Sequence, residues 1–275
     1  MLVSVIIPTY NRANFLKEAI DSVLNQDYKN FELIVVDDGS TDETTSLLKE
    51  YYDKIKYIRI PHQGVSRARN VGIEQAKGGL IAFLDSDDLW MPKKLSIQVE
   101  FFKKHLDALV CQTEEIWIRN GRRVNPKKYH IKPSGMIFEQ CLKRCMVSTS
   151  SVMVRRSLFE SIGVFDESFY VCEDYEIWLR VSARYPIYLL REALVIKRGG
   201  HSDQLSKTPC LDKWRISAIE KLLSKNTLSS SQRHLAIKEM TLKCNIYGGG
   251  CIKRGRLKEG LYYLNLPKKY TQSLP

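Results

Sequence analysis

The fold is decided by residues 3–11, which read VSVIIPTYN. The first five are apolar or β-branched at nearly every position, which is typical of a strand buried on both faces of a parallel sheet. The polar residues Thr9, Tyr10 and Asn11 follow where this strand ends. Ligands bind beyond the carboxyl ends of the strands in open parallel sheets, so we expect a binding site there.

Strands and amphipathic helices alternate through the first 90 residues. Further buried strands are expected at residues 31–36, 57–60 and 80–84. The helices between them are expected at residues 15–24, from Ser40 and from Ser66. Ser40 is followed three residues later by Glu43, which is a capping-box pattern. This order predicts an α/β fold, a Rossmann-like, mainly parallel sheet flanked by helices on both faces.

The pattern changes after residue 107. A helix opening at Pro92 is expected to carry a core-facing stripe that ends at Leu106. Longer strands are then expected at 108–118, 150–154 and 187–196, a helix at 174–184 and a basic loop at 121–133. From residue 212 we expect helices broken at 229–231 and 248–250. We therefore divide the chain into residues 1–107, 108–210 and a helical extension at 211–275.

Composition places the chain in a broad class. Of 275 residues, 44% are hydrophobic and 27% charged, the balance of a soluble globular protein. The longest apolar runs are far shorter than the roughly 20 residues of a membrane helix, and the start lacks a basic segment and cleavage site. Seven scattered cysteines, without a second pair or a histidine cluster, are expected to be free thiols. These features predict a cytoplasmic protein.

The formal charge of +12 is unevenly distributed. Residues 1–90 carry 10 Lys+Arg against 14 Asp+Glu, residues 91–210 carry 20 against 13, and residues 211–275 carry 13 against 4. The net charges are therefore −4, +7 and +9. A basic second half suits an anionic surface, an anionic acceptor or nucleic acid, although a solvated basic face without a partner remains an alternative.

Acidic residues collect at the predicted strand ends. Asp37 and Asp38 end the second strand, and Asp85 and Asp87 follow the fourth. Two residues that are two positions apart on an extended segment point the same way, so Asp85 and Asp87 offer two hard oxygen ligands for Mg²⁺ or Mn²⁺. Asp-x-Asp alone is common in turns, but this placement favours a metal. Neither a Gly-x-Gly-x-x-Gly segment after the first strand nor a Walker loop is present.

Four ordered segments resemble family 2 glycosyltransferases. They are VSVIIPTYNR at 3–12, VDDGSTD at 36–42, ARNVG at 68–72 and DSDD at 85–88. The likeness is strong over residues 1–90, continues at 163–167 and 173–180, and fades after about residue 206. The family often has Asn-x-Gly before its Ala-Arg-Asn segment, where this chain has His62-Gln63-Gly64. Family members are inverting, metal-dependent enzymes of the GT-A fold that use nucleotide-diphospho-sugars.

The resemblance implies a role for individual residues. Those implied to bind the nucleotide are Pro8, Tyr10, Asp38, Arg69 and Asp85. Those implied to hold the metal, Mn²⁺ or Mg²⁺, are Asp85, Asp87 and His201. Asp174 is implied as the catalytic base, and acceptor-side or diphosphate candidates are Glu173, Arg198 and Ser206. The structural alternatives are a turn role for Asp38, a core-bridging role for Arg69 and a helix cap for Asp174.

The function expected from this resemblance is hexosyl or N-acetylhexosaminyl transfer in cell-surface polysaccharide biosynthesis of a bacterial envelope. One sugar would pass from a nucleotide donor, expected to be a UDP-sugar, to a hydroxyl of a glycan or lipid-linked glycan. The processive synthases carry membrane helices and Gln-x-x-Arg-Trp, and this chain has neither. The basic residues at 211–275 could contact anionic lipid at the inner membrane face.

Three rival functions are weighed against this one. A non-catalytic module of the same fold would bind sugar-nucleotides without turnover. A nucleotidyltransferase would have a Gly-rich, Lys-containing loop after the first strand, where this chain has Pro8-Thr9-Tyr10-Asn11-Arg12. Nucleic acid is not expected as a partner, because the basic residues lack an aromatic-rich strand motif.

Overall fold

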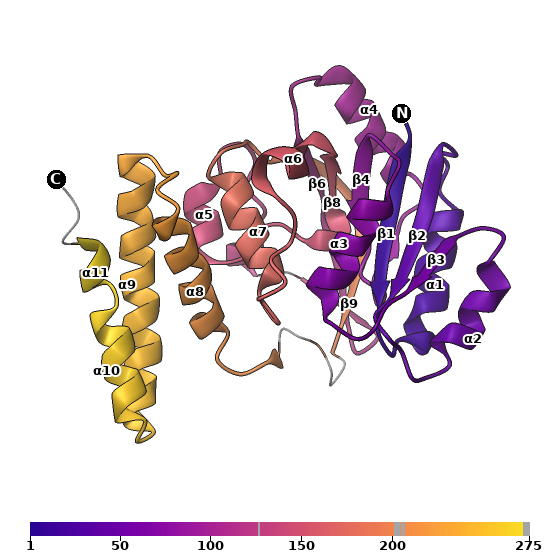
Figure 1. Cartoon of the computed structure of the whole chain (residues 1–275). Helices are drawn as coiled ribbons and strands as arrows, with labels where there is room; N and C mark the ends of the chain where they lie inside the picture. The colour runs from indigo at the N-terminus through magenta and orange to yellow at the C-terminus, as the bar shows by residue number, and fades with distance from the viewer. Residues whose placement is uncertain (126, 201–203, 205–206, 272–275) are drawn as a thin grey trace.

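The computed structural model describes residues 1–125, 127–200, 204 and 207–271. Within them the strands form one sheet of order β3-β2-β1-β4-β8-β6-β9-β5, with β7 paired to β6 (Figure 1). The strands are β1 (Val3–Thr9), β2 (Phe31–Asp37), β3 (Lys56–Arg59), β4 (Leu80–Phe83), β5 (Leu89–Trp90), β6 (Val110–Arg119), β7 (Arg122–Val124), β8 (Val152–Arg155) and β9 (Tyr188–Gly199).

Helices cover both faces of the sheet, which confirms the predicted α/β class. They are α1 (Ala13–Leu24), α2 (Thr44–Leu48), α3 (Val65–Gln75), α4 (Lys94–Lys104), α5 (Phe138–Lys143), α6 (Ser157–Ile162), α7 (Glu173–Ser182), α8 (Leu211–Ser224), α9 (Ser230–Lys253), α10 (Leu257–Asn265) and α11 (Lys268–Thr271). None of the helices described combines the length and the hydrophobicity that a membrane crossing requires.

The first four long strands are parallel. β1 pairs with β2 and β4, and β2 pairs with β3, all in parallel. A helix connects each strand to the next along the chain, so their carboxyl ends meet at one edge. The register places Thr9 opposite Asp37, so the polar ends of β1 and β2 are neighbours. Beyond β4 the sheet is mixed, because β8 is antiparallel to β4 and β6 while β6 and β9 are parallel.

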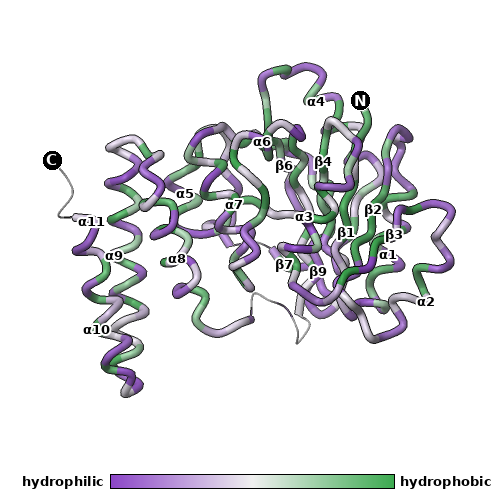
Figure 2. Tube along the Cα trace, viewed as in Figure 1, coloured by the Kyte–Doolittle hydropathy of each residue, from purple (hydrophilic) through white to green (hydrophobic). Residues whose placement is uncertain are grey.

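Alternate residues of the central strands belong to two hydrophobic cores. In β1, Val5 and Ile7 pack in the core that α1 and α4 cover, whereas Ile6 packs in the core that includes α3 and α7. Residues of β2 and β4 alternate in the same way. Figure 2 shows the result as hydrophobic central strands joined by largely hydrophilic loops. A sheet covered on both faces holds its strand ends rigidly, which is what a site at those ends requires.

The capping box expected at Ser40 is wrong. Helix α2 begins at Thr44 without a side-chain cap. Ser40 Oγ instead accepts a hydrogen bond from the Asn11 backbone N–H at 2.9 Å, so this hydroxyl ties the ends of β1 and β2 together. A capping box is present at Ser229, with Gln232 as its partner, where a helix break was expected.

The expected helix break at residues 248–250 is also wrong, because α9 runs through all three glycines. Gly248 lies against α10, where a Cβ atom would come within 2.9 Å of the Gly260 carbonyl oxygen. Glycine therefore allows the two helices to approach closely, and the chain turns instead at Gly255, whose φ is +77°.

Two further expectations are corrected. Helix α4 ends at Lys104, and Leu106, expected in its core-facing stripe, is 78% exposed. Residues 121–133, expected as a loop, include β7, which pairs back on β6. The turn between these strands uses positive φ values at Asn120 and Gly121.

Lys94 of α4 is a fully buried lysine. Its side chain donates a hydrogen bond to Gln98 Oε1 at 2.6 Å and lies 4.0 Å from the centre of the Trp90 ring. Burial lowers the pKa of Lys94 to about 7. The neutral amine is therefore favoured in the folded state at a pH where the unfolded chain remains protonated.

We predict that Lys94 contributes an increase in the free energy of unfolding between pH 7 and pH 10, so that the slope of this free energy against pH is smaller in Lys94→Met than in the wild type. Above a pKa of about 7 the folded state has lost the proton, while the unfolded lysine keeps it up to its ordinary value of 10.5. Lys94 by itself then contributes up to about 1.4 kcal/mol per pH unit to the slope of the free energy of unfolding. Urea unfolding at several pH values measures the slope, with the exposed neighbour substituted in Lys93→Met as the control. Equal slopes in the wild type and Lys94→Met would contradict the prediction.

Candidate active site

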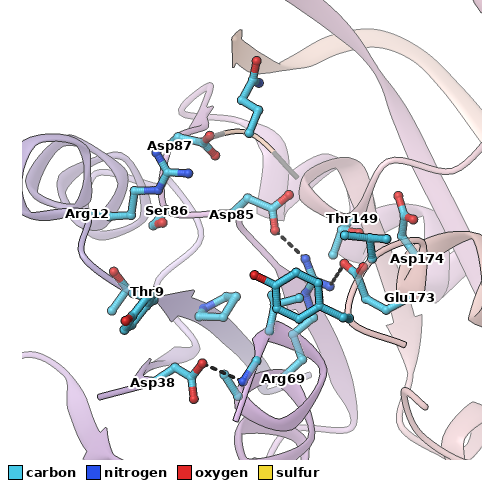
Figure 3. A pocket seen from close by; sticks show the side chains of 18 of the residues that line it. Thr9, Arg12, Asp38, Arg69, Asp85, Ser86, Asp87, Thr149, Glu173 and Asp174 are labelled. Carbon is cyan, nitrogen blue, oxygen red and sulfur yellow. Dashed lines mark hydrogen bonds and ion pairs between the residues drawn. The ribbon is translucent and has the colours of Figure 1, made fainter. Parts of the chain in front are cut away.

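A pocket of about 710 Å³ lies at the carboxyl ends of β1, β2 and β4 and beside the start of α7 (Figure 3). All of the predicted site residues that the structure describes line it, namely Pro8, Tyr10, Asp38, Arg69, Asp85, Asp87, Glu173, Asp174 and Arg198. The predicted His201 and Ser206 lie outside the described residues. Residues from both halves of the chain therefore meet in one cleft, although their individual roles stay predictions.

Arg69 is the buried centre of this pocket. It belongs to α3 and is 3% exposed. Its Nη1 donates to Glu173 Oε1 at 2.7 Å and its Nη2 donates to Asp85 Oδ1 at 2.8 Å. Burial alone would lower the pKa of Arg69, but Asp85 and Glu173 raise it above its ordinary value, so the guanidinium stays charged. Arg69 thus joins the end of β4 to the beginning of α7.

The carboxylate of Glu173 is committed to this bridge. Glu173 is 5% exposed, and burial raises its pKa against the opposing effect of Arg69, with Asp174 adding to the rise. Arg69 also lies 5.2 Å from the centre of the Phe165 ring. The hydrogen bond with Arg69 and the burial of both side chains make Glu173 a structural partner of Arg69.

Asp38 organises the loop before α3. Its two carboxylate oxygens accept hydrogen bonds from the backbone N–H groups of Gln63 and Gly64, each at 2.8 Å. His62 Nδ1 lies 2.8 Å from Asp38 Oδ2. The Gly64 backbone has φ of +96°, which favours glycine where the chain enters the helix. Asp38 therefore has the turn role that was considered for it, and it also lines the pocket.

His62 is a site residue that the sequence did not single out. Its ring stacks on Tyr10, with centroids 4.0 Å apart and planes at 19°. The two rings form an aromatic wall beside Asp38 at the β1 and β2 end of the pocket. The signal in the sequence is the departure from Asn-x-Gly at residues 62–64, where His62 stands.

The segment after β4 is a turn and not the extended segment that was expected, because the Asp88 backbone N–H donates to the Asp85 carbonyl oxygen at 3.0 Å. Asp85 and Asp87 are partly exposed, Ser86 and Asp88 are buried, and all four line the pocket. Asp88 accepts hydrogen bonds from the Ser150 hydroxyl at 2.6 Å and from the Arg198 backbone N–H at 2.9 Å. Burial raises the pKa of Asp88 well above its ordinary value, which the charge of Lys197 opposes.

The donor set fits a hard cation only in part. Among the residues that the structure describes, no three His, Cys, Asp or Glu side chains come together as a metal site. Asp85 and Asp87 still offer carboxylate oxygens on the pocket side, and one oxygen of Asp85 is held by Arg69. Two carboxylates suit Mg²⁺ or Mn²⁺ when the remaining ligands are water and phosphate. The residues present therefore fit a metal that is bound together with a diphosphate.

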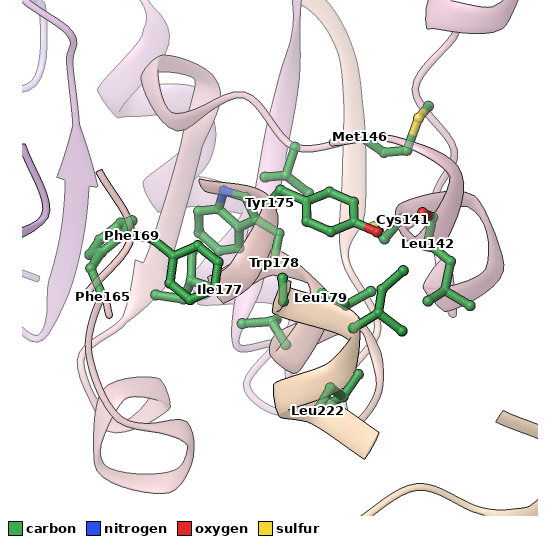
Figure 4. Close-up of a cluster of buried hydrophobic side chains, with 14 of the residues drawn as sticks. Cys141, Leu142, Met146, Phe165, Phe169, Tyr175, Ile177, Trp178, Leu179 and Leu222 are labelled. Carbon is green, nitrogen blue, oxygen red and sulfur yellow. Dashed lines mark hydrogen bonds between the residues drawn. The ribbon is translucent and has the colours of Figure 1, made fainter. Parts of the chain in front are cut away.

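Asp174 lies in the first turn of α7 and faces the pocket. Cys172, with φ of 62°, is the helix N-cap residue, so Asp174 is not the cap. The helix is anchored by Tyr175 and Trp178, which are almost fully buried among hydrophobic side chains (Figure 4). Tyr175 also donates a hydrogen bond to the Leu142 carbonyl oxygen at 2.6 Å. This anchoring holds the Asp174 carboxylate at the edge of the cleft.

Several cations of the pocket wall were not predicted. Arg12, Lys197 and Arg215 line it together with the predicted Arg198. The guanidinium of Arg198 pairs with Glu18 and bonds the Asp87 carbonyl oxygen, so it is turned toward α1. Burial would lower the pKa of Lys197, but the surrounding carboxylates raise it. A cationic wall of this kind suits an anionic ligand.

The family model of glycosyl transferase family 2 matches residues 4–163, which is more than half of the chain. The chain therefore belongs to this family.

Similar proteins agree with this assignment. An uncharacterized glycosyltransferase of Rickettsia bellii is 35% identical over 217 residues, covering 75% of this chain and 31% of its own length, so the chain spans about a third of that relative. The Escherichia coli UDP-Glc:alpha-D-GlcNAc-diphosphoundecaprenol beta-1,3-glucosyltransferase WfgD is 35% identical over 182 residues, or 66% of this chain and 69% of WfgD. The crystal structure of S. aureus TarS 1-349 with UDP-GlcNAc aligns with a TM-score of 0.79 at 22% identity, covering 100% of this chain and 82% of TarS 1-349. The predicted GT-A fold is confirmed.

Proposed function

We propose that the chain transfers a single hexosyl or N-acetylhexosaminyl group, with inversion, from a UDP-sugar to a hydroxyl of a glycan or lipid-linked glycan. The observation that carries the proposal is that Asp38, Asp85, Asp87 and Asp174 line one pocket, which cationic side chains such as Arg12 and Lys197 also line. The names of similar proteins, a UDP-glucose-dependent transferase acting on a diphosphoundecaprenol-linked sugar and a teichuronic acid biosynthesis glycosyltransferase, support the donor, the acceptor and a role in cell-surface polysaccharide biosynthesis.

The nucleotide would bind at the β1 and β2 end of the pocket. Tyr10 and His62 supply an aromatic wall for the base, next to Pro8 and Asp38. Asp85 and Asp87 would hold Mn²⁺ or Mg²⁺ against the diphosphate. When bound, such a metal neutralises the negative charge that develops on the departing nucleoside diphosphate. The cationic side chains of Arg12 and Lys197, on the same wall, would add to this neutralisation.

Asp174 would act as the base. Inversion by direct displacement needs a carboxylate that takes the proton of the acceptor hydroxyl while its oxygen bonds to the anomeric carbon and the bond to the diphosphate breaks. Glu173 is buried against Arg69, whereas Asp174 is partly exposed to the cleft. This difference supports Asp174 as the base and Glu173 as the residue that positions α7.

We place the reaction in the cytoplasm at the inner face of the membrane. The basic C-terminal region, +9 over residues 211–275, would contact anionic lipid headgroups there. Cosedimentation with anionic vesicles tests this contact. A non-catalytic module that only binds sugar-nucleotides is the remaining rival, and turnover distinguishes the two.

We predict that UDP-sugars stabilise the protein only when Mn²⁺ or Mg²⁺ is present. A ligand at 100 times its Kd adds about 2.7 kcal/mol to the free energy of unfolding, which a thermal shift assay detects. Asp85→Asn and Asp87→Asn should lose this stabilisation, and Asp53→Asn, at an exposed position, should keep it. Stabilisation that is unaffected by a chelator would contradict the metal assignment.

We further predict that Asp174→Asn lowers kcat by about 10²- to 10⁴-fold, the usual contribution of a general base. Donor affinity should be retained, because the amide is isosteric with the carboxylate and Asp174 is not among the residues expected to bind the nucleotide. Product formation and donor binding are measured on the same preparation. Wild-type turnover that survives the substitution would show that another group takes the proton.

A further inference from the structure

A second cavity of about 580 Å³ lies between the segment that enters α8 and the face of α9. The residues that matter in its lining are Cys210, Leu211, Arg215, Ile246, Tyr247 and Arg254. Leu211 and Arg215 also line the active-site pocket. The two cavities therefore adjoin each other at the start of α8.

The shared wall is on the acceptor side of the active site. The thiol of Cys172, which directly precedes Glu173 and Asp174, contacts the Leu211 carbonyl oxygen at 3.9 Å. In Figure 1, α7 lies between the sheet and α8, and α9 lies beyond α8, so the second cavity is on the far side from β2 and β3. A ligand that extends from the Asp174 side would reach this cavity without crossing the nucleotide residues.

The lining combines cationic and apolar groups. Arg254 is exposed and, across the described part of the chain, forms no ion pair. Its guanidinium lies along α9 at Gly250, where a Cβ atom would come within 2.8 Å of Nη2. Arg215 pairs with Asp212 at 3.1 Å, and its Nε is buried without a hydrogen-bond partner among the described residues. Asp212 is the acidic residue of the lining, so the two guanidinium groups of Arg215 and Arg254 stand against one negative charge.

Apolar side chains stand beside these arginines. Leu211 and Ile246 line the cavity, and Tyr247 is 6% exposed, with its hydroxyl donating to Glu259 Oε1 at 2.8 Å. Guanidinium groups bind phosphate through paired N–H···O hydrogen bonds, and aliphatic or aromatic side chains cover hydrocarbon. The matching ligand carries a phosphate joined to an apolar chain.

We propose that the second cavity binds the phosphate of a lipid-linked acceptor, with Arg215 and Arg254 on the phosphate and Leu211, Ile246 and Tyr247 on the adjoining hydrocarbon. The proposal rests on the proposed function, because it names the part of the acceptor that binds outside the reaction pocket. The acceptor sugar would then occupy the shared region between the two cavities, with its hydroxyl toward Asp174.

Cys210 offers a direct probe of this cavity. It lines the cavity and is the exposed cysteine of the chain, whereas the other six are buried or half-buried. The full chain is treated with iodoacetamide, and alkylation of Cys210 is followed by mass spectrometry. Saturating UDP together with Mn²⁺ occupies the nucleotide end of the active-site pocket, so that protection of Cys210 by a further phosphate ligand reports on the second cavity. The probe ligand is farnesyl diphosphate. Farnesol, which lacks the phosphate, and glycerol 3-phosphate, which lacks the apolar chain, are compared with it.

Farnesyl diphosphate should slow the alkylation of Cys210, and farnesol should not. Loss of one charge-assisted contact in Arg254→Gln should raise the concentration for half-protection about tenfold. Lys253→Gln removes the same charge from the next residue, which is exposed and outside the cavity lining, and should leave protection unchanged. Arg215→Gln provides a second variant from the opposite wall with the same expected loss.

Unprotected Cys210, equal protection by farnesol, or an equal loss in Lys253→Gln and Arg254→Gln would overturn the proposal. Equal protection by glycerol 3-phosphate would overturn the lipid-linked occupant in favour of a phosphate from another acceptor. Failure of the proposed function is distinguishable, because it abolishes sugar transfer from every donor while protection of Cys210 persists.

Discussion

The arrangement of the site depends on the guanidinium of Arg69, which is almost entirely buried between Asp85 and Glu173. A buried charge is tolerated only when it is paired and hydrogen-bonded, so the three side chains hold each other in place. Asp85 follows the last of the parallel strands, and Glu173 begins the helix that carries Asp174. The end of β4 and the beginning of α7 are thereby fixed relative to each other, and the core-bridging role considered for Arg69 is compatible with its place in the pocket.

The parallel half of the fold could be predicted because its signals are local. Apolar runs such as residues 3–7 mark buried strands, and acidic residues such as Asp85 and Asp87 mark the point where a strand ends. Strand ends then gather at a common edge without any knowledge of distant contacts. The fold and the location of the cleft follow from these patterns, together with the resemblance of four ordered segments to a known family.

The rest could not be predicted because it depends on contacts between distant segments. Ser40 had the pattern of a helix cap, but a hydrogen bond from Asn11 competes for its hydroxyl. Gly248 breaks isolated helices, yet packing against Gly260 makes glycine the residue that fits there. The stacking of His62 on Tyr10 and the approach of Arg215 to the pocket likewise require the folded chain. Sequence periodicity carries no information on which cations converge from α8 and β9.

The continuity of the two cavities gives the C-terminal helices a functional place, since α8 and α9 form the walls that extend the cleft. The second cavity can serve the reaction only if α7, which carries Asp174, keeps the position that the bond between Arg69 and Glu173 gives it. A double-mutant cycle of Arg69→Met and Glu173→Gln on the free energy of unfolding measures this link most directly. The account predicts a coupling of about 1–3 kcal/mol, because Glu173→Gln relieves the unpaired buried charge that Arg69→Met leaves behind. Effects that add to within about 0.5 kcal/mol would contradict it.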